Sequence, residues 1–84
     1  MAIYKVQLSK RAEKQLDKLP DKIAFPILEA INNLSLNPRP FGYIKLTGRN
    51  AYRIRIGNYR VIYEIFDKQL LIDVIEVGDR KNIY

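Results

Sequence analysis

Three arginines within one short stretch are the side chains in this sequence best suited to chemistry on an anion. Arg53, Arg55 and Arg60 lie in the segment Tyr-Arg-Ile-Arg-Ile-Gly-Asn-Tyr-Arg-Val-Ile-Tyr at 52–63. A guanidinium group donates charge-assisted hydrogen bonds to phosphate oxygens and stays charged at neutral pH. The stretch therefore provides either a phosphate-binding surface or a solvated basic face, and by itself it favours neither.

The same stretch has the pattern of a β-hairpin. Polar and apolar residues alternate, and Gly57-Asn58 suits a two-residue turn with a positive φ. The predicted register pairs Ile56 with Tyr59, Arg55 with Arg60, Ile54 with Val61 and Arg53 with Ile62. Like charges opposite each other destabilise a sheet by some tenths of a kcal/mol. The Arg55 and Arg60 pair therefore predicts either screening by water or a bound anion.

Alternation divides the hairpin into two faces. One face is predicted to belong to the core and carries Tyr52, Ile54, Ile56, Tyr59, Val61 and Tyr63. The other carries Arg53, Arg55, Arg60 and Ile62. We interpret the three tyrosines as core residues and not as surfaces on which nucleobases stack.

The composition limits the chemistry. The 84 residues include neither histidine nor cysteine, so the usual proton shuttle and thiolate metal ligands are absent from this sequence. Acid–base chemistry would fall to Tyr, Lys, Arg or carboxylates. A formal charge of +6 indicates an anionic partner, with nucleic acid first. No segment has the length of a signal peptide core or a membrane span, so we expect one cytoplasmic domain over residues 1–84.

The first half of the chain is predicted to form one strand and two helices. Ile3–Leu8 alternates as a strand, and Ser9 is placed to cap a helix that runs to Leu19. A second amphipathic helix follows Pro20-Asp21, in which Pro26 predicts either a kink or a start later than Asp21. The row formed by Lys10, Lys14 and Lys18 is interpreted as a solvated face.

The second half is predicted to be mostly strand. Residues 37–42 read as an extended loop, Tyr43–Leu46 is compatible with a short strand, and residues 67–69 form a turn. Leu70–Val77 is apolar enough for a buried central strand. The predicted fold is α+β with the order β-α-α-β-β-β, a curved antiparallel sheet packed against an N-terminal helical hairpin.

Three segments in this order resemble the RelE/ParE superfamily of prokaryotic toxins. They are Asn-Pro-Arg-Pro-Phe-Gly-Tyr-Ile-Lys-Leu-Thr-Gly at 37–48, the hairpin continued to Glu-Ile at 52–65, and Val-Gly-Asp-Arg-Lys-Asn-Ile-Tyr at 77–84. The resemblance covers essentially the whole chain and implies the RelE-like microbial RNase fold. RelE-like members cut messenger RNA in the ribosomal A site, whereas ParE-like members poison DNA gyrase.

The resemblance also implies roles for particular residues. RelE-like toxins carry basic side chains before the glycine turn, an arginine after it, an arginine after the last strand and a C-terminal tyrosine. At matching places this sequence has Arg60, Arg80 and Tyr84, which are the implied catalytic residues, and Lys45, Arg53, Arg55 and Lys81, which are the implied RNA contacts. This complete set favours the RelE-like branch, with Tyr84 as the candidate general base.

The implied partners are a cognate antitoxin, the ribosome and messenger RNA, with no metal, cofactor or membrane. Two other functions fit the same residues. One is a ParE-like gyrase inhibitor without nuclease activity. The other is a non-toxic module that keeps only the interaction with an antitoxin.

Overall fold

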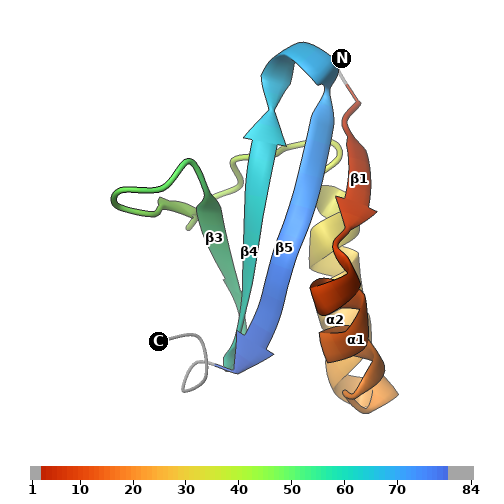
Figure 1. The fold of residues 1–84 in the computed structure, drawn as a ribbon. Helices are drawn as coiled ribbons and strands as arrows, with labels where there is room; N and C mark the ends of the chain where they lie inside the picture. Colours follow the sequence, from red (N-terminus) through yellow and green to blue (C-terminus); the bar gives the residue numbers. More distant parts are fainter. Residues whose placement is uncertain (1–2, 80–84) are drawn as a thin grey trace.

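The protein is an α+β fold in which two helices cover one face of a five-stranded sheet (Figure 1). The structure is a computed structural model, and it describes residues 3–79. The elements are β1 Lys5–Leu8, α1 Lys10–Asp17, α2 Asp21–Asn33, β2 Ile44–Lys45, β3 Tyr52–Ile56, β4 Tyr59–Phe66, a 3₁₀ turn Asp67–Gln69 and β5 Leu71–Asp79. The predicted α+β class and helical hairpin are confirmed, and the two-residue strand β2 adds one strand to the predicted order.

The sheet is mixed, because one of its four pairings is parallel. Its strand order is β1-β5-β4-β3-β2. Strand β1 runs parallel to β5, with Lys5 beside Leu71, whereas the other neighbours are antiparallel. The prediction of a wholly antiparallel sheet is therefore wrong at β1. The chain between β1 and β5 includes both helices and strands β2 to β4, and a connection of this length permits parallel pairing.

The β3–β4 hairpin has the register that alternation predicts. Ile56 pairs with Tyr59, Arg55 with Arg60, Ile54 with Val61 and Arg53 with Ile62. Gly57 has a φ of 60°, which glycine adopts without steric cost. The two-residue turn thus sets which side chains face the helices and which face away.

The core lies between the helices and one face of the sheet. It contains Ala12, Leu16, Ile27, Ile31, Leu34, Ile54, Val61, Tyr63, Ile65, Ile72, Val74 and Val77. Strand β5 is interior in the sheet, but its buried residues alternate, so only one of its faces belongs to the core. Tyr63 is fully buried, while Tyr52 and Tyr59 pack against the core from its margin.

Helix α1 begins at the predicted cap and also holds strand β5. The Ser9 hydroxyl oxygen accepts a hydrogen bond from the Ala12 amide at 3.0 Å, and its own proton goes to the Ile75 carbonyl at 2.7 Å. The Val77 amide donates to Oε1 of Gln15 at 2.7 Å. Beyond the end of β1, the side chains of the N-cap Ser9 and of Gln15 on α1 therefore form hydrogen bonds with backbone groups of β5 that β1 does not reach.

Helix α2 begins at Asp21, so the alternative of a later start is wrong. Pro20 occupies the N-cap position, and Pro26 lies inside the helix with an exposed side chain. The lysines at 10, 14 and 18 are exposed, as a solvated face requires. Beyond α2 the chain runs through a loop over residues 37–43 to β2, and that loop passes the far end of β4 (Figure 1).

Candidate nucleic-acid interface

The arginines of the β3–β4 hairpin lie on the face of the sheet turned away from the helices. Core residues Ile54 and Val61 face the helices, so the alternate positions face the other way. Those positions carry Arg53 and Arg55 on β3 and Arg60 on β4. We call these three side chains the arginine face.

The three arginines differ in burial. Arg53 is 8% exposed and Arg60 is 3% exposed, whereas Arg55 is exposed. The alternative of a fully solvated basic face is therefore wrong for two of the three, and each of the three takes part in at least one interaction. A charge held away from bulk water acts on an anion more strongly than a solvated one.

Strand β5 completes the surroundings of Arg60. Gly78 pairs with Arg60 on the side opposite Arg55, so the neighbouring strand contributes backbone and no side chain there. On the same face Glu76 lies across from Ile62, and its carboxylate forms an ion pair with Arg11 at 3.6 Å. The row across the sheet is therefore Arg55, Arg60 and Gly78, with two like charges side by side.

The other predicted catalytic residues follow strand β5. Its last residue, Asp79, pairs with Tyr59, the neighbour of Arg60 in sequence. Arg80, Lys81 and Tyr84 lie outside the described residues 3–79.

Lys45 is not on the arginine face. It pairs with Tyr52, whereas Ile44 pairs with Arg53. Partners in a ladder share a face, so Lys45 projects from the same face as Tyr52, opposite to the arginines. The structure therefore separates Lys45 from the arginines with which the sequence groups it.

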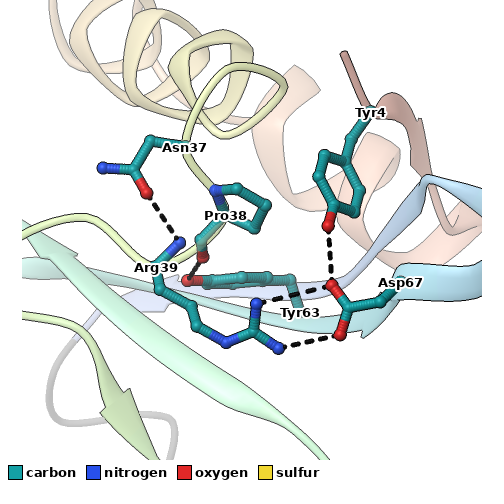
Figure 2. A network of polar contacts seen from close by, with 6 residues as sticks. All are labelled: Tyr4, Asn37, Pro38, Arg39, Tyr63 and Asp67. Atoms are coloured by element: carbon teal, nitrogen blue, oxygen red, sulfur yellow. Dashed lines mark hydrogen bonds and ion pairs between the residues drawn. The ribbon is translucent and has the colours of Figure 1, made fainter. Parts of the chain in front are cut away.

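A polar network that the sequence analysis did not find lies where the loop after α2 meets the end of β4 (Figure 2). Arg39 donates two hydrogen bonds to the Asp67 carboxylate, at 3.4 Å from Nη1 and 3.0 Å from Nη2. The Tyr4 hydroxyl donates to the same carboxylate at 2.6 Å. The pKa of Asp67 is lowered, first by the hydrogen bond from Arg39 and second by the one from Tyr4. The hydrogen bond to Asp67 in turn raises the pKa of Tyr4.

Tyr63 provides a second anchor for the loop that carries Arg39. The Tyr63 hydroxyl donates to the Pro38 carbonyl at 2.7 Å, and the Arg39 amide donates to the Asn37 side chain at 3.2 Å (Figure 2). Burial raises the pKa of Tyr63 well above its usual value. Tyr63 therefore serves the fold as a neutral hydrogen-bond donor.

Aromatic rings continue from this network toward the edge of the sheet. The Tyr63 and Tyr52 ring centroids are 6.0 Å apart, and those of Tyr52 and Tyr43 are 5.9 Å apart. The Arg39 guanidinium lies 5.4 Å from the centroid of the Tyr52 ring. The sequence signals this group only by placing Arg39 and aromatic residues together in 37–43. Asp67 gives no signal, because it lies 28 residues further along the chain.

An apolar cleft opens beside the arginine face, between α2 and β3. Its volume is about 420 Å³, and its lining includes Leu34, Phe41, Ile54 and Ile56 together with Arg55.

Within residues 3–79 no cluster of three or more carboxylate, histidine or cysteine side chains is arranged to hold a metal ion. No helix in that part of the chain is long and apolar enough to cross a bilayer.

The sequence matches a family model and named relatives over nearly its whole length. The model of the family described as "ParE toxin of type II toxin-antitoxin system, parDE" matches residues 6–84. The toxin RelG of Mycobacterium tuberculosis is 30% identical over 83 residues, which cover 96% of this chain and 95% of RelG. The toxin RelE of the same organism is 30% identical over 83 residues, covering 96% of this chain and 86% of RelE.

Solved structures of similar proteins share the fold. The archaeal RelE–RelB complex from Pyrococcus horikoshii contains a chain that is 34% identical, with a TM-score of 0.83 and coverage of 98% of this chain and 99% of that one. The toxin–antitoxin complex RelBE2 from M. tuberculosis contains one that is 28% identical, with a TM-score of 0.81 and coverage of 93% and 99%. This chain therefore belongs to the RelE/ParE superfamily, the toxins of type II toxin–antitoxin systems.

Proposed function

We propose that this chain is a single toxin domain over residues 1–84 that enters the ribosomal A site and cleaves messenger RNA. Its partners are then the ribosome, the message and a cognate antitoxin, and its place of action is the cytoplasm. The observation that carries the proposal is the arginine face, in which buried Arg60 lies beside exposed Arg55 on one hairpin. Similar chains crystallised with RelB antitoxins support the antitoxin as a partner.

The proposed reaction is an in-line attack within the RNA. The ribose 2′-hydroxyl loses its proton, and its oxygen bonds to the adjacent phosphorus. The bond from phosphorus to the 5′-oxygen breaks, and that oxygen takes up a proton. The products are a 2′,3′-cyclic phosphate and a 5′-hydroxyl, and the proposed step uses the protein's own side chains.

Arg60 and Arg80 are the proposed stabilisers of the phosphorane. Negative charge grows on the phosphoryl oxygens in the transition state, and preorganised donors aimed at that charge are often the largest catalytic contribution. Burial of Arg60 supports this role, because its side chain is held by the fold before RNA arrives. Arg53 and Arg55 would hold the RNA backbone, and Lys81 would add a further contact.

Tyr84 is the proposed general base. A tyrosine has an unperturbed pKa of about 10, so it works at neutral pH only where positive charge favours the phenolate. The arginines provide charge of that sign.

A defined messenger RNA, incubated with and without purified ribosomes, tests the proposal. We expect ribosome-dependent cuts by the wild-type protein that are lost in Arg60→Ala and Arg80→Ala. The matched control is Lys14→Ala, which removes an exposed cation from the solvated lysine row of α1 and should leave cleavage unchanged. Equal cleavage of free RNA would contradict the ribosome requirement.

A second function is favoured by one observation, namely that the matching family model is described as a ParE toxin. A gyrase-directed toxin would leave messenger RNA intact in every lane while still arresting growth. Its toxicity would also survive Arg80→Ala and Tyr84→Phe, since neither residue would perform chemistry. Failure to arrest growth at all would indicate a module that only binds an antitoxin.

A further inference from the structure

The face of the sheet opposite the arginines carries a second group of RNA-compatible side chains near its edge. Lys45 pairs with Tyr52 on that face, and the Tyr43 ring lies 5.9 Å from the Tyr52 ring. Arg39 adds its guanidinium 5.4 Å from the centre of the same Tyr52 ring. We call Arg39, Tyr43, Lys45 and Tyr52 the stacking platform.

The Arg39 plane is held in place before any ligand arrives. Its two terminal nitrogens both bond to Asp67, and the Tyr4 hydroxyl fixes that carboxylate from the other side (Figure 2). A guanidinium clamped at both nitrogens against a ring keeps one orientation. Such planes and tyrosine rings are the surfaces on which unpaired nucleobases stack.

The platform is also accessible. Tyr43 is 40% exposed, the Arg39 side chain is 38% exposed, and Lys45 is exposed. The loop is already anchored by Tyr63 and Asn37, so packing does not account for a large aromatic ring left at the surface. A base stacked there would place its phosphate within reach of a lysine that has no ion pair among the described residues.

A flat stacking surface beside one cation fits a nucleotide, which carries both a base and a phosphate. The Arg39 charge is balanced by Asp67, which leaves Lys45 as the net positive group of the platform and the rings as its main binding surface. Tyr52 and Arg53 are consecutive, so the platform and the arginine face lie on the two sides of one strand. Between strand β3 and the edge of the sheet lies only the two-residue strand β2. A single-stranded RNA could pass around this edge from one face of the sheet to the other.

We infer that the stacking platform binds one unpaired base of a single-stranded RNA whose neighbouring phosphates engage the arginine face. This inference rests on the proposed RNA-directed function. It gives Lys45 a role on its own face, as a phosphate contact beside the stacked base.

Binding of a fluorescent 2′-O-methyl oligoadenylate, which cannot be cleaved by 2′-hydroxyl attack, tests the platform by anisotropy. Tyr43→Leu should weaken binding by about 5- to 150-fold, the effect of losing one base–aromatic stack. Tyr43→Phe keeps the ring and should bind as the wild type does. Phe25→Leu is the matched control, because it removes an exposed aromatic ring from α2.

Three results would overturn the inference. They are wild-type protein that does not bind the oligonucleotide, Tyr43→Leu that binds as tightly as wild type, and Phe25→Leu that weakens binding as much as Tyr43→Leu. The same preparations go into the messenger RNA assay. Cleavage without dependence of binding on Tyr43 overturns the platform alone, and Tyr43-dependent binding without cleavage overturns the nuclease proposal alone.

Discussion

Arg39 and Arg60 place the same side chain in two opposite settings. Arg39 lies at the surface and shares its charge with Asp67, and this hydrogen bond raises the pKa of the guanidinium. Arg60 is buried, and its cross-strand partner on β3 is another arginine. The first setting fixes the position of a side chain at low net charge. The second concentrates positive charge at one place on the sheet.

The difference matters because each setting has its own physical cost. An exposed ion pair contributes little free energy, and its value lies in orientation. An arginine that lies across from a like charge is repelled by it, and an anion that binds there weakens that repulsion. We therefore expect substitutions on the arginine face to change activity, and substitutions around Arg39 to change loop anchoring and stability.

The largest expected effect is on cleavage by Arg60→Ala. Removing one preorganised donor to a developing anion lowers the rate by about 100- to 1000-fold. Single-turnover cleavage of a ribosome-bound message measures it, with Lys14→Ala as the control. The urea midpoint should fall, because a buried side chain that takes part in an interaction is removed, so cleavage is compared at a temperature where both proteins are folded. Wild-type cleavage by Arg60→Ala would remove Arg60 from the catalytic set.

On the Arg39 side, Tyr63→Phe tests anchoring without charge. The variant keeps the buried ring but loses the 2.7 Å bond to the Pro38 carbonyl, so the free energy of unfolding should fall by about 0.5–1.5 kcal/mol. Tyr59→Phe is the matched control, since it also removes a tyrosine hydroxyl, but one that has no hydrogen bond within residues 3–79. Equal urea midpoints for the two variants would show that the bond does not hold the loop.

Arg55→Gln tests whether the exposed member of the arginine face meets a phosphate. Each phosphate contact contributes about 0.7 to the slope of log K against log salt for a single strand. The slope for the non-cleavable oligonucleotide should therefore become shallower by about that amount. Lys14→Gln provides the comparison at an exposed cation elsewhere. An unchanged slope in Arg55→Gln would mean that Arg55 does not contact the backbone.

The smallest expected effect is the pH dependence of Asp67. Its hydrogen bonds from Arg39 and Tyr4 lower its pKa below the usual value of about 3.9. The ionised carboxylate therefore stabilises the fold above about pH 4, and this contribution is lost as pH falls through the lowered pKa. Asp67→Asn should melt below wild type at pH 7, and the two melting curves should converge in acid. A constant difference at all pH values would contradict this linkage.

Much of the hairpin could be predicted because its signals are local. Alternation sets the face of every residue from 52 to 63, and Gly57-Asn58 sets the length of the turn, so Arg55 and Arg60 had to be opposite each other. The Ser9 cap was predictable for the same reason, since its partner Ala12 is three residues away. The resemblance to a toxin family also rests on such contiguous segments.

Contacts between distant segments could not be predicted. Asp67 meets Arg39 across 28 residues and Tyr4 across 63, and no pattern in one sequence relates such positions. The resemblance to the toxin superfamily groups Lys45 with the arginines as an implied RNA contact. The pairing of Ile44 with Arg53 then assigned Lys45 to the opposite face.

Residue types at short spacing are enough to predict the helices, the hairpin register, the positive charge and the membership of a toxin superfamily. The parallel pairing of β1 with β5, the burial of Arg53 and Arg60 and the position of Arg39 over Tyr52 emerge only when the chain has folded. Those features depend on which remote segments pack together. Burial of a charged side chain in particular follows from its neighbours in space and not from its own chemistry.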